Sequence, residues 1–202
     1  RKPAAFGGVV GFKPTYGLIS RYGLFAFASS LDHVGCFTRS VRDAAIVTDI
    51  IKGEDPHDIT SLKDTGECLV DSLAQDIKGK KLFYIKVICD RSQYEESGDQ
   101  EILAVLDNFY DLVEKLKEKG FVIEEVSIDQ KLLEAIYPSY MTISCAEATS
   151  NNANLTGIPY GPRGEGNSVD EIMFSARTKG YSELIKRRFI LGSYILQKEN
   201  QE

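Results

Sequence analysis

The sequence predicts an α/β fold in which helices flank a mixed β-sheet, and three observations support this prediction. From residue 76 onward, segments with a helical period alternate with short apolar segments, which is the pattern of layered α/β proteins. The length of 202 residues suits one globular domain. Hydrophobic residues make up 43% and charged residues 27% of the chain, close to the average of soluble folded proteins.

A glycine-rich segment opens the chain. Residues 4–12 read AAFGGVVGF, and such a small, apolar run indicates close backbone packing or a buried strand that begins after a turn. The spacing Gly7-Gly8-x-x-Gly11 is not a dinucleotide-binding fingerprint, which needs a preceding strand and an acidic residue about 20 positions on, after a second strand. We expect dense packing here and a mostly irregular chain over residues 13–37.

The first well-defined helix is expected over residues 40–52. Ser40 can cap its first turn, and Gly53 is a typical stop. Four apolar residues at helical spacing predict its buried face: Ala44, Val47, Ile50 and Ile51. The polar residues 54–66 that follow are expected to form a loop.

Strands and helices alternate further along the chain. The apolar run LFYIKVI predicts a buried strand over residues 82–88, and FVIEEVSI predicts a second strand over 121–128. Between them, apolar residues at helical spacing and the stop at Gly120 predict a helix over 99–119. The remaining predicted elements are helices over 130–150, 169–176 and 181–197, and a long loop over 151–168.

Charge and cysteine usage narrow the class of protein. The chain has 24 basic and 30 acidic residues, a net charge of −6, so it has no global attraction for nucleic acid. No apolar run approaches the roughly 18 residues of a membrane span. The lack of a secretory signal indicates free thiols in a reducing, cytosol-like compartment. The thiols are those of four widely spaced cysteines: Cys36, Cys68, Cys89 and Cys145.

Few residues carry recognisable catalytic chemistry. The two histidines, His33 and His57, lie in different loops without an evident acidic partner, so no catalytic triad is expected, and the ligands are too few for a metal site. Glu147 lies among small and apolar residues, where a carboxylate must be paired or hydrogen-bonded. We expect it to brace its helix against a loop. Tyr140, seven residues earlier, shares that helix face.

A basic triplet, Lys186-Arg187-Arg188, interrupts the helical pattern ELIKRRFILGSYIL. At about 100° per residue, three consecutive side chains span about 200° of a helix, so at least one cation must lie near the apolar boundary. A guanidinium held there could bind a carboxylate through two hydrogen bonds. The alternative is a solvated basic face.

Three stretches resemble a known family. The segment RKPAAFGGVVGFKPTYGLISRYGLFAFASSLDHVGCFTRSVRDAA is similar to the amidase signature family, and within it KPTYGLISRYGLFAFASSLDHVG resembles the A subunits of glutamyl-tRNA(Gln) or aspartyl-tRNA(Asn) amidotransferases. YPSYMTISCAEATSNNANLTGI and KGYSELIKRRFILGSYIL agree with this resemblance, which covers essentially the whole chain. It implies the amidase signature fold, with residues 1–202 as the central part of a single domain truncated at both ends.

The resemblance also implies a chemistry. Such enzymes hydrolyse the side-chain amide of glutamine with a serine nucleophile, a second serine on a cis peptide bond and a lysine, and the ammonia passes to activated glutamyl-tRNA on a partner protein. These catalytic groups are expected before Arg1, so no catalytic residue is expected in this chain, which should be inactive alone. The implied substrate-binding residues are Tyr140 and Arg188, with Arg187 as the fallback if the register in the triplet is off by one.

Partners and location follow from the same resemblance. We expect the B and C subunits of an amidotransferase as partners, glutamine as a ligand, and misacylated tRNA bound mainly through the B subunit. No cofactor or metal is expected in this chain, whereas ATP and magnesium are expected on the partner. The expected location is cytoplasmic, with an organelle as the alternative, and without membrane contact. Two other functions stay open: another amide hydrolase of the family and, for the isolated chain, a non-catalytic binding or scaffold module.

Overall fold

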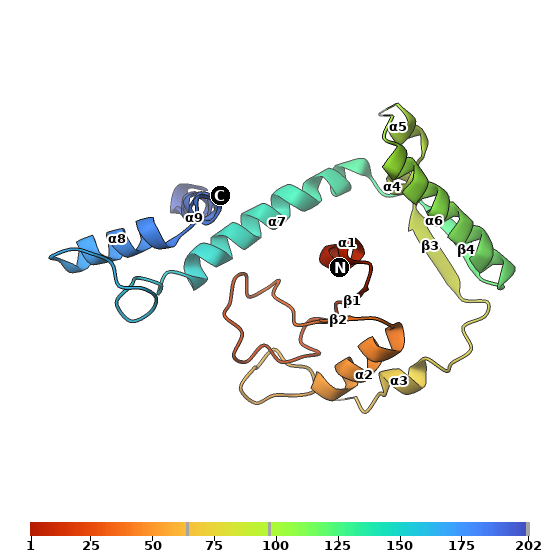
Figure 1. Cartoon of the computed structure of the whole chain (residues 1–202), viewed down its shortest axis with the longest axis horizontal. Coiled ribbons are helices and arrows are strands. Elements are labelled where there is room, and N and C mark those ends of the chain that lie inside the picture. The colour runs from red at the N-terminus through yellow and green to blue at the C-terminus, as the bar shows by residue number, and fades with distance from the viewer. Residues whose placement is uncertain (64, 97, 201–202) are drawn as a thin grey trace. The chain divides into compact units, whose positions relative to one another are not determined.

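The computed structural model describes residues 1–63, 65–96 and 98–200, and its helices and strands are labelled in Figure 1. The chain divides into two compact units: unit 1 comprises Arg1–Ala74 and Pro138–Glu202, and unit 2 comprises Gln75–Tyr137. The predicted α/β class is confirmed. In the described residues the strands form two separate two-stranded sheets, one antiparallel and one parallel.

The N-terminal part of unit 1 is a small α/β cluster. Its elements are α1 (Lys2–Gly7), β1 (Val10–Phe12), β2 (Cys36–Thr38), α2 (Val41–Ile51) and α3 (Leu69–Ser72). The prediction of a strand over residues 4–12 was only partly correct, because a helix with Pro3 in its first turn precedes β1. Gly8 forms the C-cap of this helix, and its φ of 63° is left-handed. Dense packing is confirmed at Gly11, where a Cβ would lie 2.5 Å from the Cβ of Ala4, but it is wrong for the exposed Gly7 and Gly8, where a Cβ would meet nothing closer than 3.8 Å.

Helix α2 begins at its predicted cap, because the Ser40 hydroxyl accepts a hydrogen bond from the backbone N–H of Asp43 at 3.1 Å. Its predicted buried face was partly wrong. Ala44 is buried, but Ile50 is 75% exposed and Thr48 is fully buried. The Thr48 hydroxyl donates to the carbonyl of Ala44 at 2.7 Å, and this bond makes its burial tolerable. The predicted loop after α2 is present, although Asp64 lies outside the described residues.

The C-terminal part of unit 1 is helical. It contains α7 from Pro138 onward, followed by α8 (Val169–Gly180), α9 (Glu183–Ile195) and a short 3-10 helix, η1 (Lys198–Asn200). The whole of α7 spans Gln130–Asn151, and the boundary between the units falls at its internal proline. Proline cannot donate a backbone hydrogen bond, so this is a weak point of the helix. The predicted loop between α7 and α8 is present.

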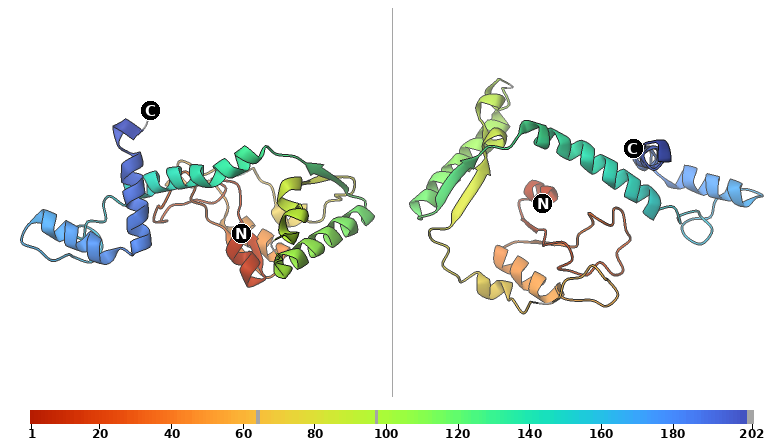
Figure 2. Two further views of the ribbon diagram at one scale, coloured as in Figure 1. Left: turned by 90° about the horizontal axis from the view of Figure 1, so that it is seen from above. Right: turned by 180° about the vertical axis from the view of Figure 1, so that it is seen from behind.

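Unit 2 is built around a βαβ arrangement. Its elements are β3 (Lys81–Ile85), α4 (Lys86–Cys89), α5 (Ser92–Glu95), α6 (Gln100–Glu118), β4 (Val122–Val126) and the first residues of α7. The strands β3 and β4 are parallel, and α6 is the connection that runs alongside them (Figures 1 and 2). The Tyr84 ring packs edge-to-face on Phe109 of α6, with centroids 5.3 Å apart.

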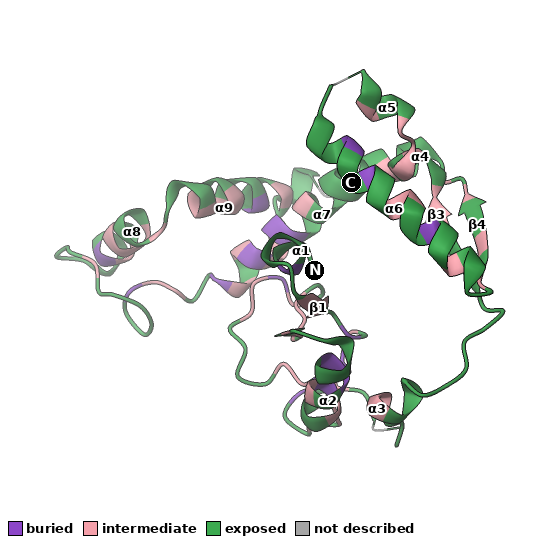
Figure 3. Ribbon diagram, turned by 45° about the vertical axis from the view of Figure 1, so that its right-hand side comes forward, coloured by how far each residue is buried: buried purple, intermediate pink, exposed green. Residues whose placement is uncertain are grey.

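The predicted strand over residues 82–88 is shorter and less buried than expected. It ends at Ile85, after which α4 begins. Phe83 is 70% exposed, because successive side chains alternate between faces and its neighbour Tyr84 takes the face toward α6. Buried residues gather instead on α2, α6 and α7 (Figure 3). In the described part of the chain, no helix is both long and apolar enough to span a membrane.

Candidate functional site

The predicted brace between α7 and a loop is present. Glu147 of α7 accepts two hydrogen bonds from Ser30, one from the backbone N–H at 2.9 Å and one from the hydroxyl at 2.5 Å. One turn later, the side-chain amide of Asn151 donates to the carbonyl of Phe27 at 3.1 Å and to the hydroxyl of Ser29 at 3.0 Å. The four residues from Phe27 to Ser30, called here the platform segment, are therefore tied to α7 at both ends.

The basic triplet of α9 places its three cations in different surroundings. Lys186 pairs with Glu183 at 2.9 Å, and Arg187 is exposed. Arg188 is half-buried, and its guanidinium carbon lies 5.6 Å from the centroid of the Phe27 ring, within the range of a cation–π contact. The prediction that at least one cation lies near an apolar boundary is confirmed: Lys186 and Arg188 are both half-buried, and Arg188 contacts the ring of Phe27.

Tyr140 lies on α7 two turns before Glu147 and is 41% exposed. Seven residues return to the same helix face after about 10 Å along the axis, so the two side chains form one stripe with Asn151. Arg188 contacts Phe27, which Asn151 holds at the C-terminal end of this stripe. Tyr140 thus lies on the face of α7 that carries Asn151, and Arg188 of α9 approaches that face through Phe27. Their binding roles stay a prediction.

A close approach of two helix backbones positions α9 on α7. A Cβ on Gly192 would lie 2.1 Å from the carbonyl oxygen of Cys145 and 2.1 Å from the Thr149 hydroxyl, so only glycine permits this approach. The Thr149 hydroxyl also lies 3.4 Å from the carbonyl of Phe189. Because Arg188 precedes Gly192 by one turn, its backbone is placed directly by α7.

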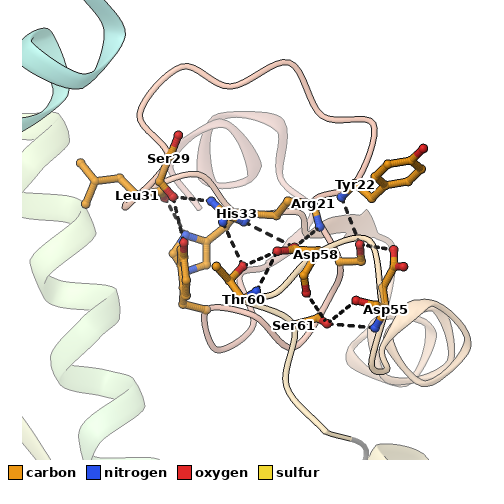
Figure 4. A network of polar contacts seen from close by, with 11 residues as sticks. Arg21, Tyr22, Ser29, Leu31, His33, Asp55, Asp58, Thr60 and Ser61 are labelled. Atoms are coloured by element: carbon orange, nitrogen blue, oxygen red, sulfur yellow. Dashed lines mark hydrogen bonds and ion pairs between the residues drawn. The ribbon is translucent and has the colours of Figure 1, made fainter. Parts of the chain in front are cut away.

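A second polar network holds the loop that carries the platform segment (Figure 4). The Arg21 guanidinium donates to the carbonyl of Ser29 and to the hydroxyl of Thr60, the latter at 2.9 Å. It lies 3.8 Å from the Asp58 carboxylate and makes a cation–π contact with Tyr16, with its central carbon 4.7 Å from the ring centroid. Arg21 therefore joins two loops that are far apart in the sequence.

Hydrogen bonds in this network also shift carboxylate pKa values. The Thr60 hydroxyl is the main cause that lowers the pKa of Asp58. A hydrogen bond of 2.6 Å from the Ser20 hydroxyl is the main cause that lowers the pKa of Asp55, with a further contribution from His57. Because acceptors of several hydrogen bonds are stabilised as anions, both carboxylates are charged at neutral pH and hold the loops together.

His57 has an acidic partner that the sequence did not reveal. Its Nδ1 lies 2.9 Å from the Asp55 carboxylate, and its ring stacks on Tyr22 with centroids 4.7 Å apart. The Nδ1 of His33 lies 2.7 Å from the carbonyl of Leu31. Within residues 1–63, 65–96 and 98–200, no group of three or more His, Cys, Asp or Glu side chains could hold a metal ion. All four cysteines are free, as predicted.

Sequence reasoning missed the residues that connect the loops. Phe27 and Asn151 are 124 residues apart, and Arg21 and Asp58 are 37 apart. Helical and strand periods relate residues only a few positions apart, so no local pattern pairs these side chains. The sequence offered one chemical hint of these contacts: Asp58 lies in a polar loop, whose side chains need hydrogen-bond partners.

Comparison with known proteins agrees with the predicted family. The model of the family described as Amidase matches residues 1–202. The chain is 41% identical over 197 residues to the A subunit of glutamyl-tRNA(Gln) amidotransferase from Halothermothrix orenii. It is 40% identical over 197 residues to the protein of the same name from Staphylococcus carnosus. In both cases the match covers 97% of this chain and 39% of the relative, so the chain spans about two fifths of their length.

Solved structures give the same fold. The A subunit of glutamyl-tRNA(Gln) amidotransferase from Thermotoga maritima matches with a TM-score of 0.67 and 32% identity, over 100% of this chain and 38% of that one. A bacterial aryl acylamidase of the amidase signature enzymes matches with a TM-score of 0.67 and 18% identity, over 100% and 38% of the two chains. The second likeness concerns the fold alone. The predicted amidase signature fold is confirmed.

Proposed function

We propose, on the premise that this chain belongs to the amidase family, that it is part of the glutamine-hydrolysing A subunit of a tRNA-dependent amidotransferase. The observation that carries this proposal is the 40% and 41% identity, over 97% of the chain, to proteins that bear that name. The complete polypeptide then releases ammonia from glutamine, and the complex uses the ammonia to convert misacylated Glu-tRNA(Gln) to Gln-tRNA(Gln).

Within this function, the described residues serve to bind glutamine. Arg188 is proposed to bind the α-carboxylate, and Tyr140 is proposed as a second contact. The cation–π contact of Arg188 with the Phe27 ring supports the first assignment. A cation–π contact restrains the position of the guanidinium, and the guanidinium N–H groups can form the two-pronged bond to a carboxylate.

The remaining parts of the machinery are proposed to lie elsewhere. The nucleophilic serine, the second serine and the lysine lie elsewhere in the complete polypeptide. Residues 1–202 form the central part of its single amidase signature domain. The B and C subunits of the amidotransferase are the proposed partners, and ATP and magnesium bind there rather than to this chain. The cytoplasm is the proposed location, which four free thiols support.

Reconstitution tests the proposal. The complete polypeptide is purified with its partner subunits, and amidation of Glu-tRNA(Gln) is measured with ATP, magnesium and glutamine. We expect Gln-tRNA(Gln) to form together with glutamine hydrolysis, and we expect the 202-residue chain alone to release no ammonia from glutamine above the buffer background. Hydrolysis of aryl or peptide amides without glutamine-dependent amidation would instead favour another amide hydrolase of the family.

A set of arginine variants tests the binding role in the same complex. Arg188→Ala is expected to raise the KM for glutamine by about one to two orders of magnitude, because a charge-assisted hydrogen bond contributes roughly 1.5–3 kcal/mol. Arg188→Lys should recover only part, since an ammonium cannot make the two-pronged contact. Amidation with added ammonia should be unchanged. Arg187→Ala is the matched control, because Arg187 is the exposed neighbour; an effect of that variant alone would move the assignment to Arg187.

A further inference from the structure

The backbone of Phe27 is held on both sides. Its N–H donates to the Asp32 carboxylate at 2.9 Å, and its carbonyl accepts from the Asn151 amide at 3.1 Å. Three residues later, Glu147 binds both the N–H and the hydroxyl of Ser30. A loop residue bound this way has little backbone freedom, so the point from which the Phe27 side chain projects is fixed relative to α7.

The ring of Phe27 in turn meets the head of Arg188. The guanidinium carbon is 5.6 Å from the ring centroid, while the backbone of α9 is placed against α7 by the close approach at Gly192. Both ends of the Arg188 side chain are therefore positioned by α7. The contact between α9 and α7 positions its backbone, and the platform segment positions its guanidinium. A long side chain held only at its backbone would sample many rotamers.

We infer that Asn151 and Glu147 are positioning residues, which orient the Arg188 guanidinium for the α-carboxylate of glutamine through the ring of Phe27. The inference rests on the proposed function, because it takes glutamine as the ligand of Arg188. A two-pronged contact needs the guanidinium to be held in place against the carboxylate, and the cation–π contact with the Phe27 ring restrains that place. The brace from α7 then sets affinity for glutamine rather than the rate of its hydrolysis.

The test uses the complete polypeptide assembled with its partner subunits. Three variants weaken the platform at different points: Asn151→Ala, Glu147→Ala and Phe27→Leu. Each is expected to raise the KM for glutamine roughly three- to tenfold, the range that follows from loss of one cation–π contact. The kcat for glutamine hydrolysis and the amidation with added ammonia should change less than about twofold.

Two further variants separate positioning from general stability. Phe27→Tyr keeps the ring and should keep the KM for glutamine. Ser168→Ala removes the N-cap of α8, whose hydroxyl accepts from the N–H of Glu171 at 3.2 Å, and so perturbs unit 1 elsewhere; it should leave that KM unchanged. In a double-mutant cycle, Phe27→Leu should add nothing to the KM of Arg188→Ala, because it acts through that guanidinium.

The outcomes distinguish this inference from the proposed function. If Arg188→Ala raises the KM but Phe27→Leu and Asn151→Ala do not, the inference fails and the proposed function stands. Additive effects of Phe27→Leu and Arg188→Ala would also overturn it. If Arg188→Ala itself leaves glutamine kinetics intact, the binding assignment falls and the inference with it. A variant that loses amidation with added ammonia has failed to fold or assemble. In that case Phe27→Leu, which keeps an apolar side chain, decides whether the platform segment positions Arg188.

Discussion

Replacement of Gly192 by alanine tests the helix contact on which the site is built. The added Cβ would lie 2.1 Å from the carbonyl oxygen of Cys145, roughly 1.4 Å short of a contact distance of about 3.5 Å. That oxygen belongs to the backbone of α7 and cannot move alone, so α9 must shift away from α7. Overpacking of this kind typically costs about 1–3 kcal/mol, against a gain in helix propensity of up to about 1 kcal/mol.

Gly180, the last residue of α8 in unit 1, provides the control, because a Cβ there would meet no atom within 4 Å. Gly180→Ala should be neutral or slightly stabilising, so a loss of stability in Gly192→Ala alone points to overpacking. We expect urea unfolding of the complete polypeptide to show Gly192→Ala as the less stable by about 1–3 kcal/mol. The KM for glutamine should rise in Gly192→Ala alone, because Arg188 lies one turn away. Equal stability and equal KM in the two variants would refute the close approach of α9 to α7.

Three other predictions concern thiols, acid stability and capping. Thiol titration of the denatured, unreduced protein should find close to four groups, since all four cysteines are free; finding none would contradict a reducing compartment. Because hydrogen bonding holds the pKa of Asp58 below its usual value of about 3.9, its carboxylate stabilises the fold above that pH, and this contribution is lost as the pH falls through the folded-state pKa. Asp58→Asn should therefore lower stability at neutral pH and flatten its decline in acid, as measured by urea unfolding, whereas a steeper decline would argue against the assignment. Ser40→Ala should destabilise α2 by about 1 kcal/mol, and an unchanged unfolding midpoint would contradict the cap.

The elements themselves could be predicted because their signals are local. Ser40 caps α2, Gly120 ends the turn after α6, and apolar residues at helical spacing mark the long helices. Each of these signals relates residues within one or two turns, so it is readable without knowledge of the partner surface. The family resemblance was likewise contained in contiguous strings, and the match to the Amidase family over residues 1–202 confirmed it.

Faces and contacts were decided only by the tertiary structure. The helical period marked Ile50 as buried, yet Ile50 is 75% exposed while Thr48 is fully buried, because the neighbours of α2 lie against the side that carries Thr48. The pattern of the triplet allowed any of its three cations at the apolar boundary, and only the tertiary structure shows that Arg187 is exposed while Arg188 contacts the ring of Phe27. Such contacts join residues more than a hundred positions apart, and their pairing depends on how the chain closes its loops rather than on any period in the sequence.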